Sequence, residues 1–569
     1  MTVFITDLMK QAQVTVRVRR GVSLTPVDGA NEVHIAHDLS AAGGDGNGGD
    51  GFRNTIPVSL SLKRALVWLN EMGGGGDKAG GDGGGDDAGD GGGDSGDSAV
   101  PLRDFRDALA GVDSHFGLLQ TAALLFNNIL TLGIATSRGR ALADIEFSHA
   151  GRELPDVSAP PGLSDATKLT LSRFAYLHRE EDELYLSRPL KDKRFVIRDS
   201  AAGKLLVDLG RGMTVRAIRD QCDRANASDD NGDDLFAGIA TLLNLLYREQ
   251  FIIDAAADST RLPTRLEEGD AAMQQWDFHD ALSHAHSRLG YNFGFDFGGA
   301  FPFVDIIAPR PAVKELPAGE RIALYQPDLQ RMAATDKRLS AVVIQRMSVR
   351  AYNEDAPVSL KQLGEFLFRT GRLLFETETR VSNLRAPAKQ TGMGLAWRPY
   401  PTGGASYELE FYLSVDRAQD LAPGIYYYAP AAHALVKLSG RNQYTEGLIQ
   451  TAFDSCARIV RPQVVVHIAA RFQRVSWKYH NIAYATMLRN AGVVYQTFYL
   501  HAVAMGLAGC GLGAGNTDLF CRATGNQPHI ECNIGEFMLG SLPADFDYNA
   551  IDLETCAAMH EARLSPTAT

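Results

Sequence analysis

Residues 398–415, RPYPTGGASYELEFYLSV, place a tight turn directly before an apolar strand, and the fold of the second half of the chain is decided here. Two adjacent glycines, Gly403 and Gly404, follow Pro401 and Thr402. Because glycine has no side chain, the backbone can approach a flat ligand closely there, and the Thr402 hydroxyl can offer a hydrogen bond. The apolar run after this turn predicts a strand from residue 409 to residue 415.

A second candidate site lies upstream, in the sequence Arg346-Met-Ser348-Val-Arg350-Ala-Tyr352. In an extended segment, residues at i, i+2 and i+4 point to one side, so two guanidinium groups and a hydroxyl would face the same way. Such a set suits a terminal phosphate, because each planar guanidinium donates paired hydrogen bonds to its oxygens. A solvated strand face would give the same pattern. The capping box that starts at Ser359 then predicts a helix.

A third candidate lies downstream, where a long apolar helix is predicted from residue 492 to residue 505 and is followed by several glycines. One of these glycines is explained by the end of the helix, but a helix C-cap does not require all of them. Backbone N–H groups of Gly511, Leu512 and Gly513 could instead meet a cofactor. We expect the apolar stretches 116–137 and 492–516 to be buried core helices, not membrane spans.

The first half of the chain has a different pattern of predicted elements. Between residues 183 and 254 it predicts a hairpin, three helices and a closing strand. The strongest of these helices is predicted for Leu235 to Arg248. This is the element order of a winged helix. Weaker signals from Val14 to Leu132 (strands at 14–19 and 32–37, helices at 61–71 and 102–132) indicate a preceding copy. Because the helix at 235–248 carries little positive charge, we favour peptide binding at the exposed hairpin edge, or a packing role, over DNA binding.

The composition excludes several classes of protein. The net charge of −12 repels polyphosphate, so no nucleic-acid partner is expected. The tracts 41–51 and 73–97 are nearly all Gly and Asp and are interpreted as flexible insertions. The six cysteines form no CxxC pair, and the histidines at 279, 284 and 286 lack carboxylate or cysteine company at ligand spacing, so no metal is predicted. The start of the chain has no signal-peptide pattern, and a cytoplasmic protein is expected.

The order of these motifs resembles the nitroreductase-like flavoproteins, and more closely the SagB/ThcOx-type azoline dehydrogenases of thiazole/oxazole-modified peptide biosynthesis. Further motifs agree with the resemblance, which runs from about Trp276 to Pro543. They are Trp276-x-Phe-His279, Gly424-Ile-Tyr426-Tyr-Tyr428 before a short strand, and Trp477-Lys478-Tyr479 before a helix. The resemblance implies an α+β fold: a C-terminal nitroreductase-like domain with a mixed, mainly antiparallel sheet flanked by helices, preceded by tandem winged-helix-like domains. The domain limits are predicted as 1–150, 151–265 and 266–569.

The resemblance also implies FMN, bound in a homodimer whose two sites are each built from both subunits. A dinucleotide is not expected, because no GxGxxG signature follows an early strand. By this analogy the phosphate and ribityl chain are held by Arg346, Ser348 and Arg350. Pro401 to Gly404 would line one face of the flavin ring, and Gly511 to Gly513 would approach its N5 edge. Two departures from the family pattern are Thr402 in place of the usual Ser and Glu408 in place of the usual Pro.

Lys478 and Tyr479 match the Lys-Tyr pair of these oxidases, which implies a catalytic role. Removing a proton from carbon needs a positioned base, for which a lysine with a lowered pKa or a tyrosinate could serve. On the residues alone, a lysine that packs beside Trp477 and a buried Tyr479 explain the motif equally well. The implied reaction is azoline oxidation on a precursor peptide, with a cyclodehydratase partner and oxygen as the final acceptor. The rivals are an NAD(P)H-dependent nitroreductase and a winged-helix regulator that binds flavin.

Overall fold

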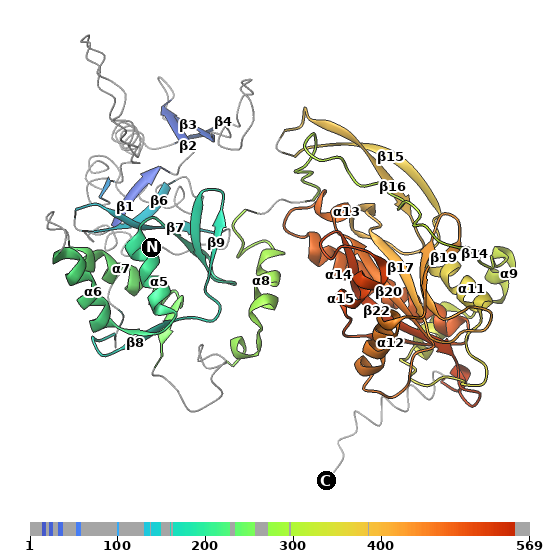
Figure 1. Ribbon diagram of the computed structural model, residues 1–569. Helices are drawn as coiled ribbons and strands as arrows, with labels where there is room; N and C mark the ends of the chain where they lie inside the picture. Colours follow the sequence, from blue (N-terminus) through green and yellow to red (C-terminus); the bar gives the residue numbers. More distant parts are fainter. Residues whose placement is uncertain are drawn as a thin grey trace. The chain divides into compact units, whose positions relative to one another are not determined.

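The computed structural model describes residues 130–551, with gaps at 137, 149–159, 161–162, 228–233, 256–270, 295–297 and 385. Before residue 130 it describes the strands β1 (Val14–Val18), β2 (Val22–Pro26), β3 (Glu32–His37), β4 (Arg53–Pro57) and β5 (Val100–Pro101). The chain divides into two compact units, Met1–Phe295 and Asp296–Thr569, each of which is taken by itself (Figure 1). Both Gly/Asp tracts, the predicted helix at 61–71 and most of that at 102–132 lie outside the described residues.

The first unit is built on a seven-stranded sheet with the order β5-β1-β6-β7-β11-β10-β9, in which all neighbouring pairs are antiparallel. The strands not yet given are β6 (Leu130–Ala135), β7 (Ala141–Phe147), β9 (Tyr176–Glu180), β10 (Glu183–Ser187) and β11 (Lys193–Ile197). A second sheet has the order β2-β3-β4, and a third joins β12 (Met213–Thr214), β8 (Lys168–Leu171) and β13 (Ile252–Asp254).

The predicted helices over 102–132 and 116–137 are wrong at their carboxyl ends, because Leu130–Ala135 is strand β6. This strand pairs with β1 on one side and β7 on the other. Central strands are shielded from water on both faces and read as continuous apolar runs, which periodicity does not distinguish from a buried helix. The short run Leu-Thr-Leu-Gly-Ile-Ala is such a case.

The predicted hairpin, helices and closing strand of residues 183–254 are present as β10, β11, α5 (Ser200–Leu209), α6 (Val215–Ala227), α7 (Leu235–Arg248) and β13. Asp199 and Asp234 cap α5 and α7, because each carboxylate accepts a backbone N–H of the first turn. One apolar face of α7 is buried in the core of this unit together with α5 and β6–β7. The winged-helix assignment itself stays a prediction.

The hairpin β10–β11 is not an exposed edge, so the predicted site for an added peptide strand is wrong. β11 pairs with β7 and β10 pairs with β9, so both strands of the hairpin have neighbours on each side. Strand β9 is the edge of the sheet. The sequence spacing showed the hairpin but not the strands that flank it: β9, which directly precedes β10, and β7, which lies further back in the chain. Downstream, η2 (Met273–Gln275) and α8 (Phe278–His286) complete the described part of this unit.

The second unit has a seven-stranded sheet with the order β14-β19-β18-β17-β20-β22-β21, and its ladders are antiparallel. Its strands are β14 (Arg321–Ala323), β17 (Leu409–Val415), β18 (Gly424–Ala429), β19 (Ala434–Gly440), β20 (Val464–Arg471), β21 (Leu507–Leu512) and β22 (Glu531–Ser541). Its helices are α9 (Leu329–Thr335), α10 (Leu339–Gln345), α11 (Leu360–Gly371), η3 (Gly403–Ala405), α12 (Gln443–Ser455), α13 (Gln473–Ser476), α14 (Ala483–Ala504), α15 (Thr517–Thr524) and η4 (Tyr548–Ala550). A separate ribbon pairs β15 (Phe375–Ser382) with β16 (Gln390–Trp397). These elements confirm the α+β class.

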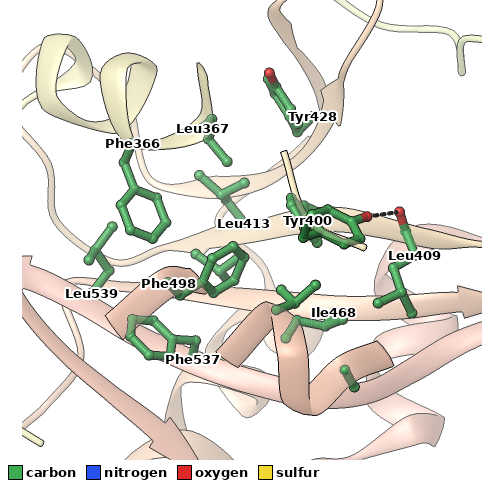
Figure 2. Packing of buried hydrophobic residues seen from close by; sticks show 14 of the residues in the cluster. Phe366, Leu367, Tyr400, Leu409, Leu413, Tyr428, Ile468, Phe498, Phe537 and Leu539 are labelled. Atoms are coloured by element: carbon green, nitrogen blue, oxygen red, sulfur yellow. Dashed lines mark hydrogen bonds between the residues drawn. The ribbon is translucent and has the colours of Figure 1, made fainter. Parts of the chain in front are cut away.

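The core of this unit lies where α11 and α14 pack on the central strands (Figure 2). Phe498 of α14 contacts Phe366 of α11, Phe411 of β17 and Phe537 of β22, with ring centroids 5.1–5.4 Å apart. The predicted capping box at the start of α11 is present, because Ser359 and Gln362 accept each other's backbone N–H. Such a cap contributes about 1 kcal/mol to stability.

Two details of the predicted elements change in the structure. Gly424–Tyr428, predicted to precede a short strand, is itself part of strand β18, and its alternate tyrosines face the two buried sides of this central strand. The predicted core helix over 492–516 is wrong after residue 504, because Leu507–Leu512 is strand β21, and of its glycines only Gly506, with φ 67°, occupies the left-handed position that ends a helix. Gly509 instead allows close packing, because a Cβ there would lie 2.7 Å from Phe537. Among the described residues, no helix is both long and apolar enough to cross a membrane.

Candidate functional site

The arginine-serine-arginine segment lies beside β21 and the carboxyl half of α14. The Val349 N–H donates to the Gly509 carbonyl at 3.0 Å, which attaches the segment to β21. The Ser348 and Tyr499 hydroxyls are 2.7 Å apart, and the Arg346 guanidinium carbon lies 5.3 Å from the centroid of the Tyr499 ring. Tyr499 therefore joins two of the three predicted phosphate-binding residues.

The charges of this segment are not neutralised by the described carboxylates. Arg346 is half-buried and Arg350 exposed, and neither takes part in an ion pair with a described residue. Burial raises the pKa of the nearby Cys510 thiol, and the charge of Arg350 opposes that rise. The predicted alternation holds only in part, because Val349 is buried but Met347 is 39% exposed. The arrangement suits an anion.

Gly511 lies at the same end of α14 as this segment. Its N–H donates to the Tyr499 hydroxyl at 2.8 Å, and a Cβ on Gly511 would lie 3.2 Å from Tyr495. The Tyr495 hydroxyl in turn donates to the Leu512 carbonyl at 3.3 Å. Gly513 is exposed, with no atom near the position of a Cβ. The contacts of Gly511 and Leu512 are thus with α14, on the side of the arginine segment.

The loop Pro401–Gly404 lies near the amino half of α14. The Gly403 N–H donates to the Asn490 side-chain oxygen at 3.0 Å, and Thr402 accepts the Tyr407 N–H at 3.1 Å. Gly404 has φ 62°, and a Cβ there would lie 2.1 Å from the Tyr479 hydroxyl and 2.5 Å from the Lys478 Nζ. Glycine is therefore required at position 404 by conformation and by space.

Lys478 and Tyr479 follow the short helix α13 and face this loop. The Lys478 amine donates to the Gly404 carbonyl at 2.8 Å and lies 5.5 Å from the centroid of Phe301. Burial lowers the pKa of Lys478, and the positive charge of Arg474 lowers it further. Burial raises the pKa of Tyr479, with a smaller contribution from Glu408. The lowered pKa of Lys478 and the raised pKa of Tyr479 favour the lysine over a tyrosinate as the base.

Glu408, which departs from the family pattern, holds the glycine loop indirectly, through Asn490 of α14. Its carboxylate accepts a hydrogen bond from the Asn490 amide nitrogen at 2.8 Å, and Asn490 in turn holds Gly403. The side chain is buried, and its second carboxylate oxygen has no described partner. Burial raises the pKa of Glu408, while the bond from Asn490 opposes the rise. Proline at this position could not make these contacts.

The two groups of predicted site residues lie along one helix. Asn490 contacts the Gly403 loop, and Tyr499, nine residues later, contacts Ser348 and Gly511. At 1.5 Å per residue, these positions are roughly 14 Å apart along α14. The helix α14 therefore connects the arginine-serine-arginine segment, which suits an anion, to the glycine loop that contacts Lys478.

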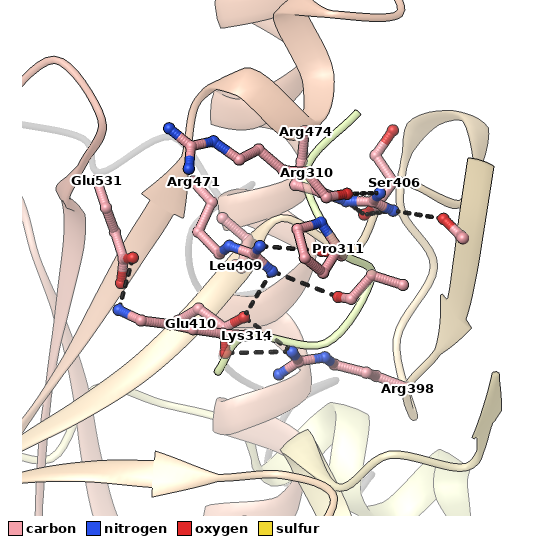
Figure 3. A network of polar contacts seen from close by, with 12 residues as sticks. Arg310, Pro311, Lys314, Arg398, Ser406, Leu409, Glu410, Arg471, Arg474 and Glu531 are labelled. Atoms are coloured by element: carbon pink, nitrogen blue, oxygen red, sulfur yellow. Dashed lines mark hydrogen bonds and ion pairs between the residues drawn. The ribbon is translucent and has the colours of Figure 1, made fainter. Parts of the chain in front are cut away.

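A buried polar network beside the lysine was not predicted from the sequence (Figure 3). Arg398 and Glu410 are fully buried and 3.2 Å apart, and Arg471 reaches Glu410 at 3.5 Å. Arg474 is only 2% exposed and has no ion pair with a described residue. Charged residues inside apolar strands, such as Glu410 in β17, were the signal that could have indicated it.

Groups of histidine, cysteine and carboxylate residues with metal-site geometry are absent from the described part of the chain. The His279 ring lies 3.2 Å from the Asp277 carboxylate, and the His284 ring packs on Trp276. Cys222, Cys456, Cys510, Cys521 and Cys532 are free thiols. Cys556 lies outside the described residues.

Two family models match this chain. Residues 169–292 match the cyanobactin oxidase ThcOx, and residues 343–535 match the nitroreductase family. The second match contains both groups of site residues. The first covers β8 to α8 and continues past that helix to residue 292.

Two curated relatives are similar to parts of the chain. The nitroreductase-type protein MJ1384 of Methanocaldococcus jannaschii is 26% identical over 196 residues, which are 34% of this chain and 86% of MJ1384. The microcin B17-processing protein McbC of Escherichia coli is 29% identical over 137 residues, which are 23% of this chain and 50% of McbC. This chain therefore spans half the length of McbC.

Solved structures show weaker similarity. A nitroreductase from Ralstonia eutropha matches with a TM-score of 0.30 and 18% identity, over 42% of this chain and 96% of that one. The E. coli microcin synthetase McbBCD complex with truncated pro-MccB17 matches with a TM-score of 0.29 and 17% identity, over 43% and 88%. Similarity of this degree does not by itself establish function. The two family matches confirm the resemblance seen in the motifs: residues 169–292 are similar to the cyanobactin oxidase ThcOx, and residues 343–535 are similar to the nitroreductase family.

Proposed function

We propose that this chain is an FMN-dependent dehydrogenase that oxidises thiazolines or oxazolines to the aromatic azoles in a ribosomally synthesised peptide. The ThcOx and nitroreductase family matches and the similarity to McbC support an oxidoreductase of peptide maturation. The observation that carries the proposal is the Lys478 amine, half-buried with a lowered pKa and 2.8 Å from the Gly404 carbonyl. A positioned amine with a lowered pKa is what a base for a carbon acid needs.

The residues of the site fit FMN. Arg346 and Arg350 have no described carboxylate to neutralise them, and the Ser348 hydroxyl lies beside them, so they would hold the phosphate and ribityl chain. The open backbone at Gly403 and Gly404 would face the ring, with Pro401 and Thr402, and Gly511 to Gly513 would meet another edge. A bound flavin would supply the hydride acceptor, reoxidised by oxygen.

Lys478 would take the proton from the ring carbon of the azoline, and its amine would become an ammonium. The Gly404 carbonyl accepts a hydrogen bond from this amine, so it fixes the direction of the nitrogen lone pair before the proton is transferred. Tyr479 remains a phenol at neutral pH because its pKa is raised, and its hydroxyl can orient the substrate or the amine.

A homodimer is proposed because α14 exposes two large side chains one turn apart, Tyr484 (51% exposed) and Leu488 (44%). Gly492 and Gln496 continue this exposed face at four-residue spacing and would let another helix approach it. A second copy that meets this face about a two-fold axis would bury the same residues from both chains.

A precursor peptide is the proposed substrate, and a cyclodehydratase is the proposed partner. An azoline forms from a Cys, Ser or Thr side chain and the preceding amide by ring closure with loss of water. Oxidation by this chain therefore requires an enzyme class that closes the ring first. The ThcOx-type segment at 169–292 would contact the peptide.

The experiment is to incubate the purified protein with an azoline-containing peptide in air and to follow the peptide by mass spectrometry. A loss of two hydrogen atoms per ring, and release of FMN but not FAD on denaturation, support the proposal. Steady oxidation of NADPH with a nitroaromatic, and no change in the peptide, would instead identify a nitroreductase that acts on small molecules. The family match at 343–535 is the observation that favours this second candidate.

A further inference from the structure

Arg474 is a buried cation that joins three segments around the proposed active site. Its guanidinium donates to the carbonyl of Ser406 at 2.9 and 3.1 Å, of Arg310 at 2.9 Å and of Gly394 at 3.1 Å (Figure 3). These carbonyls belong to the glycine loop, the segment before β14 and strand β16. One side chain therefore fixes the relative positions of three walls near Lys478.

The loop that Arg474 holds is strained. Ala405 and Tyr407 have φ angles of 51° and 42°, and Gly404 has 62°, so three of four successive residues are in the left-handed region. For residues other than glycine such conformations cost free energy and persist only where surrounding contacts enforce them. Ser406 lies between the two strained residues, and its carbonyl accepts two of the hydrogen bonds from Arg474. The Gly404 carbonyl of the same loop meets the Lys478 amine.

Arg474 also adds charge near the lysine. Arg474 precedes Lys478 by four residues, on the helix α13 and the turn that follows it. Two carboxylates, Glu408 and Glu410, favour the charge on Arg474. Two arginines, Arg471 and Arg398, repel it. Burial lowers the pKa of Arg474 to about 10, with a further contribution from Arg471, so the guanidinium remains charged at neutral pH.

The groups that face Lys478 from the elements around it do not neutralise it. They are the Gly404 carbonyl, the Phe301 and Tyr479 rings, and Arg474. The nearest carboxyl group of this network, Glu408, acts on Tyr479 and Arg474. A positive neighbour without a facing carboxylate disfavours a second positive charge on the lysine.

We propose that Arg474 is a positioning residue for Lys478: it holds the strained Gly404–Tyr407 loop against the lysine and keeps a second positive charge beside the amine. This rests on the proposed function, in which Lys478 acts as a base. A purely structural arginine would need its hydrogen bonds but not its charge. The charge and the hydrogen bonds can be separated by two substitutions, because Arg474→Lys keeps the charge and Arg474→Gln keeps amide donors without it.

The test measures the protonation of Lys478 without turnover. The full-length parent, R474K and R474Q are labelled with trace acetic anhydride across a pH series, and acetylation of Lys478 is quantified by mass spectrometry against the exposed Lys389. We expect the labelling midpoint of Lys478 to lie below that of Lys389 in the parent and in R474K. In R474Q it should rise by about one pH unit, the size of shift that one neighbouring charge produces.

An unchanged Lys478 midpoint in folded R474Q would overturn the proposal. If R474Q does not fold by circular dichroism, R474K decides: a midpoint kept near the parent supports the proposal, and a midpoint equal to that of Lys389 overturns it. Failure of this proposal and failure of the proposed function give different results. A parent that fails to oxidise azoline peptides contradicts azoline oxidation, whereas the Lys478 midpoints still report on Arg474.

Discussion

The cationic side chains near the two ends of α14 differ in exposure and in their neighbours. Near Tyr499, Arg346 and Arg350 lie at or near the surface, without a described carboxylate to neutralise them. Near Asn490, Lys478 is half-buried against a glycine loop, its pKa is lowered, and a second buried cation lies behind it. Exposed permanent cations suit binding of an anion, whereas a lysine that loses its proton easily suits chemistry. In the proposed function, cofactor retention therefore belongs to one end of α14 and catalysis to the other.

The largest effect is expected at the anion-suited end. Replacing Arg346 and Arg350 together by Ala removes both cations, so the purified protein should lose its flavin and with it all activity. Flavin content per chain, from the absorbance spectrum after gel filtration, is the measurement. The fold should be kept, because neither arginine forms an ion pair with a described residue and Arg350 is exposed. A double variant that retains its full flavin content would show that Arg346 and Arg350 do not hold the cofactor.

A smaller effect is expected from adding one carbon atom at the lysine end. Gly404→Ala places a Cβ 2.1 Å from the Tyr479 hydroxyl and 2.5 Å from the Lys478 amine, at a positive φ. We expect flavin reduction by substrate to slow at least about tenfold, because small misplacements of catalytic groups are costly. Gly392→Ala is the matched control, since that position has free space and no positive φ. Equal rates in the two variants would show that the loop does not position the lysine.

The third prediction concerns two carboxylates two residues apart, for which the same substitution should have opposite effects. Glu410→Gln leaves the fully buried Arg398 without its counter-charge and should destabilise the protein by about 3–5 kcal/mol. Glu408→Gln removes a carboxyl group whose pKa is raised by burial and which has no ion-pair partner among the described residues, so it should stabilise the protein slightly. Chemical denaturation at neutral pH compares the two. Equal destabilisation would mean that Glu408 is also held as a charged group.

The pH dependence of Glu408 gives the smallest expected effect. Because the folded-state pKa is raised, the stability contributed by this group is present at low pH and is lost as the pH rises through the folded value. Glu408→Gln should therefore unfold roughly 2–4 °C above the parent at about pH 8 and close to it at about pH 4. A gain of the same size at both pH values would exclude titration of Glu408 as its source.

The strands and helices around the site followed from local patterns, and the errors lie in apolar runs. The capping box at Ser359, the strand at 409–415 and the helices α5 to α7 were predicted because cap, turn and periodicity signals are local. Strand β6 was missed because its apolar run, paired with both β1 and β7, does not differ in periodicity from a buried helix. Strand β21 was missed because its apolar and glycine residues continue the run of α14, and its partner β22 begins 19 residues further along the chain.

The candidate site was predicted as three motifs, and the structure adds how they are connected. Lys478 and Tyr479 meet Gly404 directly. Ser348 and Gly511 meet through Tyr499, and Asn490 holds Gly403; no motif contained these two side chains of α14. Asn490 and Tyr499 are ordinary residues of an apolar helix by sequence. Glu408 was noted only as a departure from a pattern, and its role in holding Asn490 required coordinates.

The most direct test of the catalytic assignment is anaerobic reduction of the bound flavin by an azoline peptide, followed by absorbance in a stopped-flow instrument. Without oxygen, this reports only removal of the proton and hydride from the substrate. We predict that the parent reduces its flavin, and that Lys478→Met and Tyr479→Phe retain flavin and dimer but react at least about a hundredfold more slowly, as expected for loss of a general base and its orienting group. Lys478→Met keeps the apolar stem, and Tyr479→Phe removes only the hydroxyl. Reduction at the parent rate in both variants would contradict the assignment and place the base elsewhere.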